Sequence, residues 1–181
     1  MKRDSEQILT EWLVLLAQTG DLRAMNQLAT QWHPRLMRYA SRQIQDEDAA
    51  KDIVQETFIT VSRSIGKLRD PAAFPRWIYQ ILHRRGVDFL RRRARVRRND
   101  QVTCGFCGTP SDEEILTSNI DIRNALQNLK DDGYQLIHLH YLHGFNLKEI
   151  ARITGIPVGT VKSRLHSARN QLRRLLGDKL S

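Results

Sequence analysis

Residues 146–165 read NLKEIARITGIPVGTVKSRL, and this stretch decides how the second half of the chain folds. Asn146 is a good N-cap, because its side chain accepts hydrogen bonds from backbone N–H groups that lack a helical partner. Gly155 suits the left-handed residue that ends a short helix, and Pro157 suits the first turn of the next one. Two helices joined by so short a turn predict a helix-turn-helix.

The second helix of this motif has an apolar face and a polar face. The apolar stripe recurs at i, i+4, i+7, i+11 and i+14, as Val161, Leu165, Ala168, Leu172 and Leu175. The opposite face is small at its start and then polar or basic, as a major-groove reader requires: Gly159, Ser163 and His166, flanked by Lys162 and Ser167. Nearer the sides, where phosphates lie, are Arg164, Arg169, Arg173 and Arg174. The alternative is a helical hairpin with an ordinary solvated face.

Charge is unevenly distributed along the 181 residues, whose net charge is +9. Residues 81–100 hold 8 Lys and Arg against 2 Asp and Glu, and residues 146–181 hold the same numbers. Between them, residues 101–145 hold 2 Lys and Arg against 6 Asp and Glu. Two basic islands indicate two contacts with one polyanion, although charge runs are more often solvated helix faces.

Helical spacing extends over nearly the whole chain and predicts an all-α fold of two small helical domains. Helices are expected over 5–18, 22–44, 47–65, 72–94, 119–129, 132–143, 147–154 and 157–176. The stretch 97–118 is rich in Gly, Pro and polar residues and is interpreted as a flexible linker between domains at 1–96 and 119–181. No apolar run reaches the 18 residues of a membrane span and no signal peptide is recognisable, so we expect a cytoplasmic protein without membrane insertion.

The helix predicted over 47–65 separates apolar from acidic residues. Its buried face is Ala50, Ile53, Val54, Thr57, Phe58 and Val61. Its outer face is Asp48, Asp52, Gln55, Glu56, Ile59 and Arg63. An acidic surface with an exposed aliphatic side chain favours a contact with protein over a contact with DNA.

The helix predicted over 72–94 combines an apolar face with a basic one. Its buried residues are expected to be Phe74, Ile78, Ile81, Leu82 and Phe89. Opposite them lie Arg76, Gln80, Arg84, Val87 and Arg91, with His83 beside. The preceding loop, residues 64–75, carries Lys67 and Arg69 and is expected to be flexible. Basic residues, Trp77 and a flexible loop together suit single-stranded DNA, unless Trp77 and Phe74 are simply core. Arg85 points with the apolar face and is expected to reach Asp88 or to emerge at the domain edge.

Several of these segments resemble the sigma-70 family of RNA polymerase subunits. DIVQETF at 52–58, WIYQI at 77–81 and DFLRRR at 88–93 are similar to region 2, while EIA at 149–151 and GTVKSRL at 159–165 are similar to region 4. The resemblance covers about residues 20–95 and 120–177, and the absence of a folded domain between them is typical of the extracytoplasmic-function group.

The resemblance implies three surfaces and no catalysis. Asp52, Gln55 and Glu56, with Asp48 and Ile59 beside them, correspond to positions that dock on the β′ clamp helices of core polymerase. The −10 promoter element is melted and read by loop 64–75 and helix 76–93: Lys67, Arg69, Arg76, Trp77, Gln80, His83, Arg84, Val87 and Arg91. The −35 element is met by Gly159, Thr160, Lys162, Ser163, Arg164, His166, Ser167 and Arg169. The implied partners are core polymerase, including its β flap, promoter DNA and an anti-sigma factor, and no cofactor is implied. Arg84 stands where the family often has Asn, so the promoter sequence is not predicted.

Two alternatives remain open. A free-standing helix-turn-helix regulator accounts for the C-terminal domain but not for the N-terminal one. A thiol oxidoreductase or a zinc site would use Cys104 and Cys107, whose CxxC spacing alone is a weak signal. The nearest further ligands are His138, His140 and His143, of which only His140 and His143 share a face of an α-helix.

Overall fold

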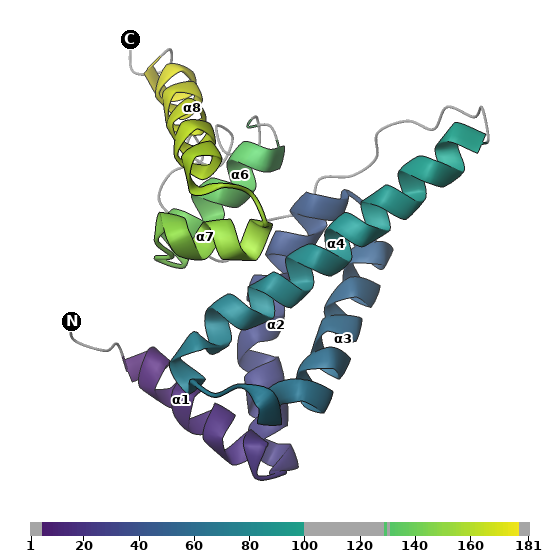
Figure 1. Cartoon of the computed structure of the whole chain (residues 1–181), viewed down its shortest axis with the longest axis vertical. Coiled ribbons are helices and arrows are strands. Elements are labelled where there is room, and N and C mark those ends of the chain that lie inside the picture. Colours follow the sequence, from purple (N-terminus) through teal and green to yellow (C-terminus); the bar gives the residue numbers. More distant parts are fainter. Residues whose placement is uncertain (1–4, 100–128, 130, 178–181) are drawn as a thin grey trace. The chain divides into compact units, whose positions relative to one another are not determined.

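The computed structural model describes residues 5–99, 129 and 131–177 of the chain. All regular structure within these residues is helical, and the helices form two compact units, Met1–Gly108 and Thr109–Ser181 (Figure 1). The prediction of an all-α chain with two small helical domains is therefore confirmed. In the part of the chain that the structure describes, no helix has the length and apolar character needed to cross a membrane.

The observed helices lie close to the predicted ones. The first unit contains α1 (Ser5–Gln18), α2 (Leu22–Ile44), α3 (Glu47–Ser64), η1 (Ile65–Lys67), η2 (Pro71–Ala73) and α4 (Phe74–Asn99). The second contains α6 (Asp131–Ile137), η3 (His138–Leu142), α7 (Leu147–Thr154) and α8 (Val158–Gly177). The helix predicted over 119–129 lies outside the described residues, except for the buried Leu129.

Helix α4 is longer than predicted, because it continues past residue 94 to Asn99. The added residues are Arg, Val and Asn, and no Gly or Pro interrupts the run before Gly105. The helix therefore includes the first residues that had been assigned to the linker. The rest of that linker, with Cys104 and Cys107, lies outside the described residues.

Local capping fixes where the helices of the first unit begin. Asp21 accepts hydrogen bonds from Arg23 N at 2.7 Å and Ala24 N at 3.1 Å and so caps α2. Asp46 accepts one from Ala49 N at 3.2 Å and caps α3. Between these helices Gln45 adopts a left-handed conformation with φ of 54°, which turns the chain back so that α3 packs on α2.

Aromatic rings fill the core of the first unit. Trp32 of α2 meets Phe74 edge-on at 5.6 Å and Tyr79 at 6.3 Å between ring centroids, and Tyr39 meets Tyr79 at 5.3 Å. Phe74, Ile78 and Leu82 are buried as predicted, whereas Phe58, Ile81 and Phe89 are only half-buried. Tyr79 was not expected in the core. It is buried because α4 packs against both α2 and α3, so that more than one stripe of the helix is covered.

The helix-turn-helix has the predicted local structure. The Asn146 side chain accepts hydrogen bonds from Lys148 N and Glu149 N, both at 3.0 Å. Glu149 Oε2 accepts one from Asn146 N at 2.9 Å, which completes a capping box. Gly155 is left-handed, with φ of 72°, and α8 begins directly after Pro157.

The histidine cluster differs from its prediction. Residues 138–142 form a π-helix, in which positions i and i+5 face each other. His138 Nε2 therefore lies 3.0 Å from His143 Nε2, while His140 Nδ1 lies 2.9 Å from the carbonyl oxygen of Phe145. The expectation that His140 and His143 share a face was wrong, because it assumed α-helical spacing throughout.

Candidate nucleic-acid interface

Helix α8 presents a continuous polar and basic surface in the second unit. Its apolar residues Val161, Leu165 and Ala168 are buried, and Leu172 and Leu175 are half-buried. The residues predicted to face DNA are exposed, apart from the half-buried Thr160: Gly159, Lys162, Ser163, Arg164, His166, Ser167 and Arg169. The packing of the apolar stripe therefore fixes which side of α8 faces solvent.

Two side chains on this surface are oriented by bonds within α8. Ser163 Oγ donates to the carbonyl oxygen of Thr160 at 3.1 Å. His166 Nε2 lies 3.0 Å from Asn170 Nδ2, so the amide donates to the imidazole ring. Such side chains offer donors and acceptors at fixed positions, which is what reading base edges in a major groove requires.

The first unit carries a second basic surface along α4. Gln80, Arg84 and Arg91 are exposed, whereas Arg76, Trp77, His83 and Val87 are half-buried. Beyond them the exposed Arg92 and Arg95 extend the positive charge toward the end of the helix. Arg93 instead forms an ion pair with Asp46, with 3.5 Å between Arg93 Nη1 and Asp46 Oδ2. This pair links the C-terminal part of α4 to the N-cap of α3.

Two of the predicted DNA contacts also serve the core. His83 Nδ1 lies 2.8 Å from the Tyr39 hydroxyl and 3.4 Å from Gln43 Nε2. The Trp77 ring rests against Phe74 at 6.2 Å between centroids. Both side chains are held at the rim of the aromatic core, which limits how far each can move toward a ligand.

The loop before α4 is ordered, contrary to the expectation of flexibility. It consists of η1 and η2, and Asp70 caps η2 by accepting from Ala72 N at 3.0 Å. Gln18 Nε2 donates to the carbonyl oxygens of Ile65 and Leu68 at 3.0 and 2.7 Å. Lys67 and Arg69 are exposed on this constrained loop.

Helix α3 presents the predicted acidic surface. All five residues of this surface that were predicted to contact polymerase are exposed: Asp48, Asp52, Gln55, Glu56 and Ile59. Lys51 sits beside them, with its Nζ 2.9 Å from Glu47 and 3.5 Å from Asp48. The hydrogen bond to Glu47 raises the pKa of Lys51, and the charge of this lysine offsets part of the negative charge of the surface.

Arg85 connects the acidic surface to α4. Its guanidinium pairs with the Glu56 carboxylate and donates to Thr60 Oγ1 at 2.5 Å. Arg85 thus pairs with Glu56 and not, as had been expected, with Asp88. Asp88 Oδ1 lies 3.9 Å from Arg91 Nη1 instead. Arg85 points with the apolar face because α3, with Glu56 on its edge, packs against that face.

Sequence reasoning missed Gln18 and the Glu56–Arg85 pair. Gln18 lies 47 and 50 residues before its two partners, and Glu56 lies 29 residues before Arg85. Nothing local distinguishes a glutamine at a helix end from a solvated one. Among the described residues there is also no group of three or more potential metal ligands, and the two cysteines lie outside them.

Comparison with known proteins places both units in one group. Residues 28–96 match the family described as Sigma-70 region 2, and residues 120–172 match Sigma-70, region 4. The chain is 30% identical to the ECF RNA polymerase sigma-E factor of Haemophilus influenzae, over 93% of this chain and 95% of that protein. It is 33% identical to the RNA polymerase sigma factor SigV of Bacillus subtilis, over 75% of this chain and 81% of that protein.

Solved structures agree with this result. The fold is similar to that of the sigma factor RpoE from Bartonella quintana, crystallised with the anti-sigma factor NepR. The TM-score is 0.72 at 25% identity, and the match covers 86% of this chain and 98% of that one. CnrH, solved in complex with the cytosolic domain of CnrY, has the same fold with a TM-score of 0.62.

Proposed function

The chain belongs to the extracytoplasmic-function group of RNA polymerase sigma factors, promoter-specific initiation factors, and we propose that it divides this work among three surfaces. The acidic surface of α3 docks on the β′ clamp helices of core polymerase. Loop 64–75 and α4 melt and read the −10 element, and α8 reads the −35 element. A sigma factor binds polymerase and DNA without catalysing a reaction, so we assign no catalytic residue.

The observation that carries this proposal is the order of the two matched regions together with the exposed surfaces that they carry. Residues 28–96 include the acidic α3 surface and the basic α4 surface, and residues 120–172 include the exposed polar surface of α8. An acidic surface that suits a basic protein partner, together with basic surfaces that suit DNA, fits a protein that bridges polymerase and DNA.

The energetics fit a melting factor. Unstacking a base costs a few kcal/mol, which base capture and phosphate neutralisation offset. The exposed Arg84, Arg91, Arg92 and Arg95 supply positive charge along one helix, where a single strand runs beside it. Because these residues bind the opened strand more tightly than the duplex, they shift the melting equilibrium toward the opened DNA.

Two further assignments follow from the family. Because the RpoE structure is a complex with an anti-sigma factor, we propose that an anti-sigma factor also regulates this chain. We further propose that the protein works in the cytoplasm, where bacterial polymerase transcribes.

Run-off transcription tests the proposal directly. Purified chain is added to bacterial core polymerase with a library of genomic fragments, and we expect transcripts that start at defined sites only when the chain is present. Asp52→Arg, which reverses one charge on the acidic surface of α3, should abolish these transcripts. Absence of site-selective initiation by the wild-type chain would refute the proposal.

The same preparation distinguishes a free-standing regulator. Such a regulator shifts a promoter fragment in a gel without polymerase and needs a dimer to cover two half-sites. We expect the isolated chain to bind duplex promoter weakly, and tight specific binding by the chain alone would favour the regulator.

A further inference from the structure

Gln18, the last residue of α1, holds the turn that precedes the DNA-facing helix. Its Nε2 atom lies 3.0 Å from the carbonyl oxygen of Ile65 and 2.7 Å from that of Leu68. An amide nitrogen carries two hydrogens, so both donors of one side chain are used on one short segment. Gln18 lies outside residues 28–96, the part of the chain that matches region 2.

The two acceptors bracket the exposed part of the turn. Leu68 N also donates to the carbonyl oxygen of Ile65 at 3.0 Å, which closes the turn, and Ile65 is buried. Gly66 and Lys67 lie between the bracketed carbonyls and are exposed, and Arg69 follows directly. The conformation in which Lys67 is presented therefore depends on a side chain from another helix.

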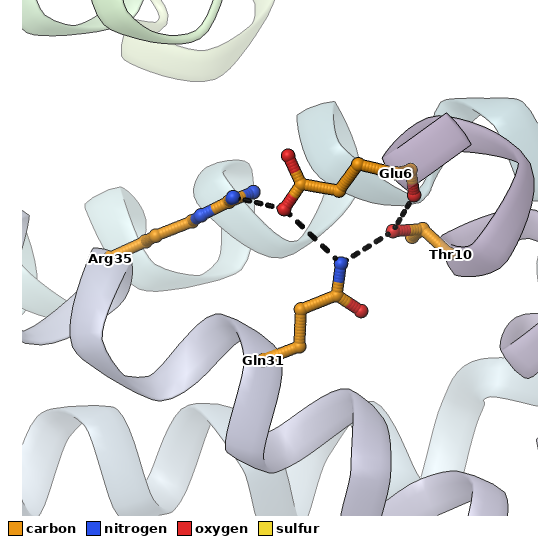
Figure 2. Close-up of polar contacts among 4 residues, drawn as sticks. All are labelled: Glu6, Thr10, Gln31 and Arg35. Atoms are coloured by element: carbon orange, nitrogen blue, oxygen red, sulfur yellow. Dashed lines mark hydrogen bonds and ion pairs between the residues drawn. The ribbon is translucent and has the colours of Figure 1, made fainter. Parts of the chain in front are cut away.

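Helix α1 is itself fixed, so that Gln18 acts from a rigid support. Figure 2 shows Glu6 and Thr10 of α1 meeting Gln31 and Arg35 of α2. Gln31 Nε2 donates to Thr10 Oγ1 at 3.2 Å, Thr10 Oγ1 donates to the Glu6 carbonyl oxygen at 2.9 Å, and Arg35 pairs with the Glu6 carboxylate. At the other end, Thr19 Oγ1 donates to the carbonyl oxygen of Leu16 at 2.8 Å and closes the turn into α2.

We propose that Gln18 is a positioning residue for the −10 element: it orders the 65–68 turn before DNA arrives. This inference rests on the proposed function, because it takes loop 64–75 as the part of the chain that captures a base from the opened strand. A loop that is already ordered loses less conformational entropy on binding, so its affinity for the captured base is higher.

The test compares an opened strand that has the captured base with one that lacks it. The probes are single-stranded nontemplate oligonucleotides from a promoter on which wild-type holoenzyme produces a run-off transcript. One is intact, and the others carry a single abasic site at successive −10 positions. Gln18→Met keeps the length of the side chain and removes both donors, and Gln7→Met on the exposed side of α1 is the matched control.

We expect wild-type and Gln7→Met holoenzymes to bind the intact strand about tenfold more tightly than the strand lacking the captured base. A tenfold ratio of affinities corresponds to the free energy of about one hydrogen bond. For Gln18→Met this ratio should fall toward one, because the loop no longer holds the geometry that recognises the base. Gln18→Glu has no donors either and should show the same loss.

The ratio separates positioning from general damage. A variant that is merely less stable binds both strands less well and leaves the ratio unchanged, and an unchanged ratio for Gln18→Met would overturn the inference. If wild-type holoenzyme makes no selective transcript, the proposed function fails instead, so the two failures are distinguishable.

Discussion

Reversing the charge of Glu56 is expected to reduce both folding stability and polymerase affinity, whereas reversing Asp52 should reduce affinity alone. Glu56 pairs with Arg85, and their side chains are 57% and 32% exposed. A pair this exposed contributes about 0.2–1 kcal/mol, and a second guanidinium in place of the carboxylate adds a repulsion of similar size. The total loss is about 1 kcal/mol, which lowers the Tm of a domain of this size by roughly 4–8 °C.

The assay combines thermal unfolding, followed by circular dichroism, with a pull-down on core polymerase. Asp52→Arg should melt like wild type and fail to bind, because Asp52 is exposed. Glu56→Arg should melt earlier and bind poorly. The double variant E56R/R85E rebuilds the pair in reverse, so its Tm should recover while its affinity for core stays low. A wild-type Tm for Glu56→Arg, or restored polymerase binding in the double variant, would contradict this reasoning.

Three further predictions concern the two units. Asn146→Ala removes the cap of α7 and should destabilise the helix-turn-helix by about 1 kcal/mol in thermal unfolding, whereas Asn146→Asp should be nearly neutral. Gly86→Ala places a Cβ against the side-chain amide of Gln43 in a buried site and should lower stability by about 1–3 kcal/mol; a wild-type melting curve would mean that Gln43 moves aside freely. The slope of log affinity against log salt for holoenzyme on its promoter is negative, and Arg169→Ala should reduce its magnitude by about 0.9, the value for one phosphate contact. An unchanged slope would remove Arg169 from the DNA contacts.

The elements predicted well are those with local signals. Asn146, Glu149 and Gly155 act within a few residues of one another, so their caps are readable from sequence alone. The acidic face of α3 follows from helical spacing, because one side of that helix packs on its neighbours and leaves the other side exposed.

The features that were missed depend on geometry that spacing does not contain. His138 and His143 meet because the chain adopts a π-helix there, and no residue in HLHYL signals the change of period. Tyr79 is buried because α4 contacts two helices, which a single apolar stripe does not reveal. Loop 64–75 has the composition of a flexible segment, yet Gln18 and Asp70 order it through hydrogen bonds to its backbone.

These contacts also make the acidic residues of α3 unequal. A basic group of the polymerase that approaches Glu56 has to share that carboxylate with Arg85, so the gain is the difference between two ion pairs. Asp52 is exposed, and no ion pair to it is found among the described residues, so its full charge is available. Because Arg85 belongs to α4, any shift in the Glu56 carboxylate on docking also changes a contact of the helix assigned to the −10 element. Under the proposed assignment, the surface for polymerase and the helix for the −10 element therefore share one side-chain pair in the first unit.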